Sequence, residues 1–365
     1  SVMLYDFYID PDITKARTLP ASFYRDPKVF KALKNKILRR SWQWIGDESL
    51  VPGPHRVYPF YLLDGFIPEP LLLTKDTTGE VCCLSNVCTH RGNLLISEPC
   101  KSRKLVCGYH GRRFALDGTF EFMPEFEQAK SFPADCDNLT KLHLYHWGPH
   151  LFTSLDPGFD LREILAVMEE RIGFMGIKNF RPYKDRSSDY LINAHWALYC
   201  DNYLEGFHIP FVHKELDAVL DYGSYDTFLF DHLSLQVGYA SSPDELVFDL
   251  PEGHVDHGKK VAAYYFWVFP NLMFNFYPWG LSVNVVKPVS EEKSKVSFRT
   301  YVYDESKLDK GAGAGLDTVE MEDEAVVESV QKGVQSSLYT HGRFSPTRER
   351  GVHHFHLLLS RFLRS

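Results

Sequence analysis

The sequence lacks the features that define several large classes of protein. No apolar run reaches the roughly 18 residues of a membrane-spanning helix, and the N-terminal segment has neither the basic start nor the apolar block of a secretory signal. No G-x-G-x-x-G follows a predicted strand, so a dinucleotide-binding fingerprint is absent. The formal net charge of −8 argues against nucleic acid or an anionic membrane as the main partner.

Cysteine is scarce, and its spacing shows no disulfide framework. The 365 residues contain 7 cysteines, an odd number. They stand at Cys82, Cys83, Cys88, Cys100, Cys107, Cys136 and Cys200. Because the cytoplasm keeps thiols reduced, this usage predicts a cytoplasmic protein.

The length and the apolar content predict two domains. With 365 residues, of which 44% are hydrophobic, the chain can bury more than one core. Short strands and turns dominate the first part of the chain, and helices around a long run of strands dominate the second. We expect an α+β protein with an N-terminal helical segment (1–45), an all-β domain (46–155) and a domain of antiparallel sheet covered by helices (156–365).

Local patterns predict the individual elements. Apolar residues at helical spacing predict helices at 22–45, 161–172, from 317 onward and at 352–363. Apolar runs between turn residues predict hairpins at 71–87 and 114–122, closing strands at 143–155 and consecutive antiparallel strands at 261–302. The glycines of 310–316 predict a flexible loop.

Two short clusters carry the strongest chemical signal. Cys88-Thr89-His90 and Cys107-Gly108-Tyr109-His110 each contain one Cys and one His. Structural zinc is the common use of two Cys and two His, but zinc sites usually keep like residues together. One Cys and one His per loop, each followed by a glycine, favours a [2Fe–2S] cluster in which two His replace two Cys on one iron, the Rieske arrangement.

A second set of residues predicts a mononuclear metal site. His208 and His213 stand on either side of Pro210, which we expect to break a helix after His208 and so bring His213 back. On the helix from residue 317, Asp323 falls within an apolar stripe, whereas Glu324 projects away and Glu322 lies at the edge. A carboxylate on a buried stripe must be paired or bind a metal. Two His and one carboxylate form the facial triad of non-haem Fe(II) oxygenases. The stripe itself consists of Val319, Val326, Val327, Val330 and Val334.

The same segments resemble one family. Residues 85–120 resemble the Rieske domain of ring-hydroxylating-type oxygenases, and residues 201–213 and 320–336 resemble their iron-binding segments. The resemblance implies a catalytic domain of the helix-grip type, with Cys88, His90, Cys107 and His110 as cluster ligands and His208, His213 and Asp323 as iron ligands. Respiratory Rieske proteins carry two further cysteines where this chain has Asn93 and Tyr109, so the resemblance is to the low-potential oxygenase type.

The resemblance also implies partners and an electron path. A separate flavin- or ferredoxin-type reductase would pass electrons from NAD(P)H to the cluster, and the mononuclear iron would use them with O2. In the family a carboxylate bridges an iron-ligand His and a cluster His of a neighbouring subunit. Glu205, expected one helical turn before His208, matches it, with Asp201 as the alternative. That arrangement implies a homotrimer.

The substrate is the open question at this level. The aromatic segment 264–279, with FPNLMFNFYP at 269–278, resembles the choline, betaine and carnitine oxygenase branch. Its rings could hold a quaternary ammonium ion by cation–π contact, hold an aromatic ring, or pack in the core. We therefore expect a terminal oxygenase that hydroxylates or oxidatively demethylates a small molecule. The alternatives are an aromatic-ring hydroxylase or O-demethylase, and an electron-transfer Rieske protein without oxygenase activity.

Overall fold

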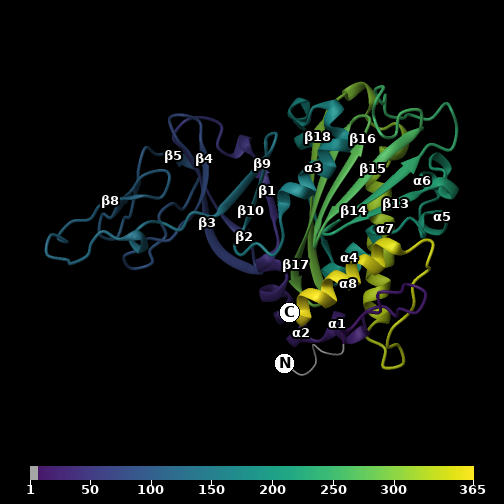
Figure 1. The fold of residues 1–365 in the computed structure, drawn as a ribbon, viewed down its shortest axis with the longest axis horizontal. Helices are drawn as coiled ribbons and strands as arrows, with labels where there is room; N and C mark the ends of the chain where they lie inside the picture. The colour runs from purple at the N-terminus through teal and green to yellow at the C-terminus, as the bar shows by residue number, and fades with distance from the viewer. Residues whose placement is uncertain (1–6) are drawn as a thin grey trace. The chain divides into compact units, whose positions relative to one another are not determined.

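The computed structural model describes residues 7–365, and the chain divides into two compact units (Figure 1). Residues 42–157 form one of them, here named the β unit. The preceding residues through Ser41, together with residues 158–365, form the other, named the α+β unit. The fold class expected from the sequence is therefore confirmed. Among residues 7–365, none of the helices combines the length and apolar character that a membrane crossing needs.

The β unit consists of small antiparallel sheets. Their strand orders are β1-β10-β9, β4-β3-β2-β5 and β6-β7-β8. The predicted hairpins and closing strands are confirmed as the pairs β3–β4, β7–β8 and β9–β10. The bounds are β1 (Gln43–Asp47), β2 (Arg56–Leu63), β3 (Ile67–Lys75), β4 (Val81–Ser85), β5 (Cys100–Lys101), β6 (Leu105–Val106), β7 (Arg113–Phe114), β8 (Phe120–Phe122), β9 (His143–Trp147) and β10 (His150–Ser154).

An eight-stranded antiparallel sheet forms the centre of the α+β unit. Its order is β11-β18-β17-β16-β15-β14-β13, with β12 also paired to β18. The four long strands β15 to β18 confirm the predicted run, with turns where the sequence placed them. The bounds are β11 (Arg181–Pro182), β12 (Ser188–Ile192), β13 (Asp226–Phe230), β14 (Leu233–Tyr239), β15 (Val261–Val268), β16 (Leu272–Tyr277), β17 (Gly280–Ser290) and β18 (Lys293–Val302).

Helices pack against this sheet. Helix α4 contacts β17, β18 and α7, and α8 contacts β13 (Figure 1). Helix α3 spans the predicted residues 161–172, and α7 and α8 lie where the sequence predicted them. The bounds are α1 (Ala21–Arg25), α2 (Pro27–Lys36), α3 (Leu161–Ile172), α4 (Trp196–Tyr203), α5 (Ile209–Val212), α6 (Lys214–Val219), α7 (Leu316–Gly333) and α8 (Arg350–Arg364).

Two predicted segments were wrong in detail. The single helix expected at 22–45 is two helices, α1 and α2, because Pro27 begins the second and Asp26 caps it; Gln43 to Ile45 belong to strand β1. The glycine-rich stretch 310–316 contains a short 3₁₀ turn, Gly311–Gly313, with Ala312 and Gly313 buried, so it is packed rather than a free loop.

Candidate metal centres

Two loops of the β unit share one backbone geometry. After β4, the Cys88 N–H donates to the Asn93 carbonyl (2.8 Å), and the Gly92 N–H donates back to the Cys88 carbonyl (3.0 Å). After β6, the Gly111 N–H donates in the same way to the Cys107 carbonyl (3.0 Å). The two glycines have φ of 78° and 79°, a left-handed conformation that favours glycine. The glycines noted in the sequence therefore shape both loops.

The four expected cluster ligands lie at two depths. Cys88 and Cys107 belong to one buried core cluster, and each is 3% exposed. His90 is half-buried and His110 is exposed, with ring centroids 4.8 Å apart. The loops thus bring together two buried sulfurs and two outward imidazoles, the donor set of a Rieske cluster.

Hydrogen bonds favour a thiolate at Cys107. Burial would raise the pKa of this thiol, but its Sγ accepts hydrogen bonds from the Tyr109 N–H (3.4 Å) and the Asn93 side-chain amide (3.5 Å), and the pKa is lowered. These are the two positions where respiratory Rieske proteins carry their extra cysteines. In this chain they stabilise a sulfur that would ligate iron, so the loops fit the cluster.

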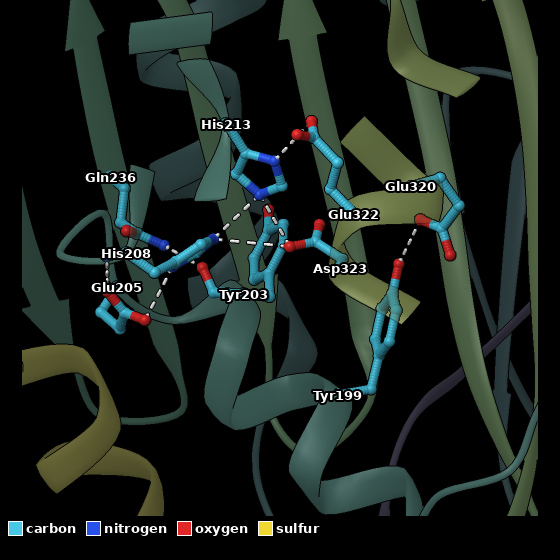
Figure 2. Close-up of polar contacts among 9 residues, drawn as sticks. All are labelled: Tyr199, Tyr203, Glu205, His208, His213, Gln236, Glu320, Glu322 and Asp323. Atoms are coloured by element: carbon cyan, nitrogen blue, oxygen red, sulfur yellow. Dashed lines mark hydrogen bonds and ion pairs between the residues drawn. The ribbon is translucent and has the colours of Figure 1, made fainter. Parts of the chain in front are cut away.

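His208, His213 and Asp323 converge in the α+β unit (Figure 2). His208 immediately precedes α5, His213 follows it, and Asp323 lies in the middle of α7. His213 Nε2 is 2.8 Å from Asp323 Oδ1 and 3.1 Å from His208 Nε2, and His208 Nε2 is 3.4 Å from Asp323 Oδ1. One ligand atom from each lies within 4.8 Å of the others, so a single ion can contact all three.

Outer carboxylates orient both imidazoles. Glu205 Oε1 lies 2.7 Å from His208 Nδ1, and Glu322 Oε1 lies 3.2 Å from His213 Nδ1 (Figure 2). A ring that donates its Nδ1–H to a carboxylate leaves Nε2 free to bind a metal, an arrangement typical of His ligands. Both Nε2 atoms face Asp323, so this donor set fits an iron ion.

The pKa values of His208 and Asp323 are shifted in opposite directions. Burial would lower the pKa of His208, but hydrogen bonds with Asp323 and Glu205 outweigh it and raise the pKa to about 9. Burial would likewise raise the pKa of Asp323, but hydrogen bonds with the two imidazoles hold it below its ordinary value. The site therefore keeps Asp323 ionised.

Glu205 reaches His208 from a loop, not from a helix. The expected helix through both residues is wrong because α4 ends at Tyr203. The Glu205 carboxylate also accepts the His208 backbone N–H (2.9 Å), which fixes the loop. Gly206 allows the close turn, since a Cβ there would come within 2.8 Å of the Tyr225 ring.

Pro210 brings His213 back to His208 as expected, but by starting a helix and not by ending one. It stands in the first turn of α5, which begins after His208, instead of ending a longer helix. One short helical turn then separates the two His residues and returns His213 to His208.

Asp201, the alternative bridge, has other partners. Its carboxylate accepts a hydrogen bond from Tyr24 OH (2.6 Å) and lies 2.8 Å from His356 Nε2. The Leu19 N–H donates to the other ring nitrogen of His356 (3.0 Å), so Nε2 carries the proton that Asp201 accepts. Asp201 thereby ties α1 and α8 to α4, and no hydrogen bond joins it to His208 among the contacts of the described residues.

Glu320 is a buried residue beside the candidate site that was not predicted from the sequence. The residue is 7% exposed, its Oε2 accepts a hydrogen bond from Tyr199 OH (2.7 Å), and its Oε1 has no protein partner (Figure 2). Burial raises the pKa of Glu320 to about 8. Its position three residues before Asp323 was a signal, because the two residues share a helix face.

The buried face of α7 is rotated relative to the predicted stripe. Glu320, Val327 and Gln331 are buried, whereas Val330 is 43% exposed. The prediction for Val330 was therefore wrong, although Asp323 does lie on the inner side.

A cavity of about 360 Å³ adjoins the three metal-ligating candidates. Sheet pairing aligns Tyr265, Asn275, Ser282 and Thr300 in one row, and all four line it. Rings contribute much of the wall, from Tyr190, Tyr199, Tyr203, Tyr225, Tyr265, Tyr277, Trp279 and Phe298. Alternate residues of the aromatic segment, Tyr264, Phe266 and Phe276 among them, are instead fully buried.

Comparison with known families decides the classification. The ring hydroxylating alpha subunit (catalytic domain) family matches residues 177–365, and the Rieske [2Fe-2S] domain family matches residues 41–133. The chain belongs to the ring-hydroxylating alpha-subunit family. This alpha subunit is therefore an oxidoreductase of the Rieske oxygenase class, with a [2Fe–2S] cluster and a mononuclear iron as cofactors.

Relatives of this alpha subunit are named monooxygenases. Chloroplastic choline monooxygenase of Arabidopsis thaliana is 30% identical over 97% of this chain and 85% of the relative. The carnitine monooxygenase oxygenase subunit of Escherichia coli (strain K12) is 27% identical over 96% of this chain and 95% of the relative. The predicted likeness to the choline and carnitine branch is confirmed.

Solved structures share the fold. The quaternary ammonium Rieske monooxygenase CntA superimposes with a TM-score of 0.74 at 23% identity, covering 97% of this alpha subunit and 96% of that chain. Naphthalene 1,2-dioxygenase from Rhodococcus sp. bound to indole gives 0.70 at 18% identity, covering 94% of this alpha subunit and 93% of that chain. One architecture thus serves different substrates, and the fold alone does not select among them.

Proposed function

We propose that this alpha subunit is the terminal oxygenase of a system that hydroxylates or oxidatively demethylates a small quaternary ammonium compound. The observation that carries the substrate class is the cavity beside His208, His213 and Asp323. Aromatic rings form much of its wall, and ring faces attract cations. The relatives named for choline and carnitine support the same class.

The charges of the cavity agree with a cationic substrate. Its lining includes five acidic residues, of which Glu320 keeps its proton below about pH 8. Among the described residues that line it, only one is a Lys or Arg, namely Arg186. Arg186 is held by Asp309 through two hydrogen bonds of 2.8 and 2.6 Å. The wall therefore offers acids and rings but no unpaired basic side chain. Its volume of about 360 Å³ suits a small molecule.

The roles of the residues follow from their contacts. We propose that Cys88, His90, Cys107 and His110 hold the [2Fe–2S] cluster and that His208, His213 and Asp323 hold the iron. When bound, these groups supply one-electron storage and O2 activation. Glu205 and Glu322 fix the orientation of the two imidazoles. The aromatic wall positions the substrate and excludes water.

We further propose a homotrimer in which Glu205 connects His208 to His110 of a neighbouring chain. Glu205 is better placed for this role than Asp201, which is bonded to Tyr24 and His356. Exposed rings flank both ends of the proposed connection: Phe207 and Phe211 beside His208, and Tyr109 stacked on His110. Such side chains are suited to burial in an interface.

A separate reductase and a cytoplasmic location complete the proposal. The described chain carries no dinucleotide-binding fingerprint, so NAD(P)H would act through a flavin- or ferredoxin-type partner. All seven cysteines lie among the described residues and are free thiols, which suits a reducing compartment.

A substrate panel tests the proposed reaction. Purified alpha subunit with a supplied reductase and NADH would be incubated with choline, glycine betaine, carnitine, the tert-butyl isostere of each, in which a neutral carbon replaces the cationic nitrogen, and benzoate. We expect O2 uptake with a hydroxylated or demethylated product for at least one quaternary ammonium compound, and a rate at least tenfold lower for its neutral isostere. Product from benzoate alone would contradict the substrate class.

Mixed trimers test the connection between chains. Chains with His110→Ala and chains with Asp323→Ala would each be inactive, but coexpressed chains should regain activity, because an intact cluster can then serve an intact iron site next to it. The parent variants and each variant coexpressed with itself are the controls. No recovery in verified mixed trimers would contradict electron transfer between chains.

A further inference from the structure

Arg112 is a buried cation beside the loops that hold Cys88 and Cys107. Its side chain is 2% exposed, and its guanidinium carbon lies 5.1 to 5.4 Å from the ring centroids of Phe120, Phe126 and Phe132. A buried charge is costly unless it is compensated, and rings within about 6 Å provide cation–π attraction. The β unit is thus built to keep a positive charge at this place.

Hydrogen bonds join Arg112 to both loops. Its carbonyl accepts the Cys107 N–H (2.8 Å), and its Nη1 donates to Thr89 Oγ1 (2.9 Å), next to Cys88. Thr89 Oγ1 in turn donates to the Asp137 carbonyl (2.8 Å), and Asp137 Oδ1 lies 3.3 Å from Nη1. The backbone of Arg112 thus closes the Cys107 loop, and its side chain ties that loop to the Cys88 loop and to a third segment.

The aromatic cage also reaches a ligand candidate. Phe126, one of the three rings around Arg112, meets the His90 ring edge-on with centroids 5.5 Å apart. The loops have no disulfide between them, since all the cysteines of the chain are free thiols. A fixed link between the loops must therefore come from noncovalent contacts.

We propose that Arg112 is a positioning residue that braces the two ligand loops in place of a disulfide and, through its charge, raises the reduction potential of the [2Fe–2S] cluster. Reduction adds one negative charge to the cluster, and a nearby cation in a poorly solvated environment stabilises that charge. Asp137 offsets part of this effect, but it is the more exposed partner, with 17% of its side chain accessible against 2% for Arg112.

Four variants test the inference. Arg112→Met removes the positive charge and the hydrogen bonds to Thr89 and Asp137. Arg112→Lys keeps the charge but loses the planar guanidinium that makes those bonds. Asp137→Asn removes the opposing negative charge. Arg113→Met is the matched control, because Arg113 is the next residue and its side chain is 45% exposed. The midpoint potential of the cluster, its EPR spectrum and its retention would be measured on the purified holoprotein.

We expect Arg112→Met to disfavour reduction at least tenfold, which is about 59 mV for one electron. Asp137→Asn should shift the potential in the opposite direction. Arg112→Lys should keep the reduction equilibrium of the cluster within threefold of the native value but should lose the cluster faster. The Arg113→Met control should match the native protein in both reduction potential and cluster retention. If Arg112→Met fails to hold the cluster, the test rests on whether the midpoint potential rises in Asp137→Asn. Unchanged potential in Asp137→Asn, or in cluster-loaded Arg112→Met, would overturn the proposal.

Discussion

Asp323 is the proposed carboxylate ligand of the mononuclear iron. It is the carboxylate that contacts both His208 and His213, at 3.4 and 2.8 Å. We expect Asp323→Ala to lose the mononuclear iron, about one of roughly three irons per chain, while the visible absorption of the cluster remains. Metal analysis and absorption spectra check this, with Glu324→Ala as the control on the same helix. Loss of the cluster together with the iron would count against the assignment.

Glu320 makes a separate prediction about stability. Because burial raises its pKa to about 8, the folded protein keeps this proton over a range in which the unfolded chain, with a pKa of roughly 4.3, has lost it. The stabilising protonation is therefore fully present at low pH and is lost as pH rises toward 8. One pH unit in this range corresponds to about 1.4 kcal/mol. Relative to the native protein, the free energy of unfolding of Glu320→Gln should therefore rise by roughly 3 to 4 kcal/mol between about pH 5 and pH 8.

Urea unfolding at several pH values measures this difference. Glu170→Gln, which alters an exposed carboxyl on α3, is the control and should follow the native curve. Parallel pH curves for Glu320→Gln and the native protein would show that the buried carboxyl is ionised when folded.

At the scale of elements, the two cluster loops depend on their glycines. Gly92 has a φ of 78°, and a Cβ there would meet nothing within 4 Å, so Gly92→Ala introduces backbone strain without a clash. We expect the free energy of unfolding to fall by about 1 kcal/mol. We also expect the variant to release the cluster faster in mild denaturant. Gly108→Ala is the matched control: it lies in the second loop, it also has open space, and its φ is not positive. Equal behaviour of the two variants would contradict this role.

Local signals determined how well each element could be predicted. Helix α3 matches its predicted range because Asp160 caps it and its apolar spacing is regular. The helix at 22–45 was predicted too long because its apolar spacing continued past Pro27, which begins a second helix. Which half of the aromatic segment lines the cavity depends on strand register, as for Tyr265 paired with Asn275, and register is a tertiary property.

The candidate site was predictable where it rests on residue type and spacing. His208, His213 and Asp323 could be proposed from the sequence because metal chemistry restricts the donors. The Tyr199–Glu320 hydrogen bond joins residues 121 positions apart, and no local pattern predicts it. The same holds for Asp201, whose partner His356 is 155 residues away.

At the scale of the whole molecule, the proposed function is a relay of electrons between two metal centres. The oxygenase class follows from the families matched by the two parts of the chain. What remains to be tested is that Glu205 links the centre at His208 to the cluster of another chain. Glu205 is suited to that role, since its carboxylate holds both the backbone N–H and the ring Nδ1 of His208.

The most direct measurement is the reoxidation rate of the reduced cluster in Glu205→Gln. Chemically reduced protein with both metals loaded would be mixed with O2 and substrate in a stopped-flow spectrometer, and Asp201→Asn would serve as the comparison. We predict that Glu205→Gln keeps its iron content and its cluster spectrum but reoxidises at least 100-fold more slowly than the native protein, whereas Asp201→Asn changes the rate far less. A native rate in fully loaded Glu205→Gln would contradict the account.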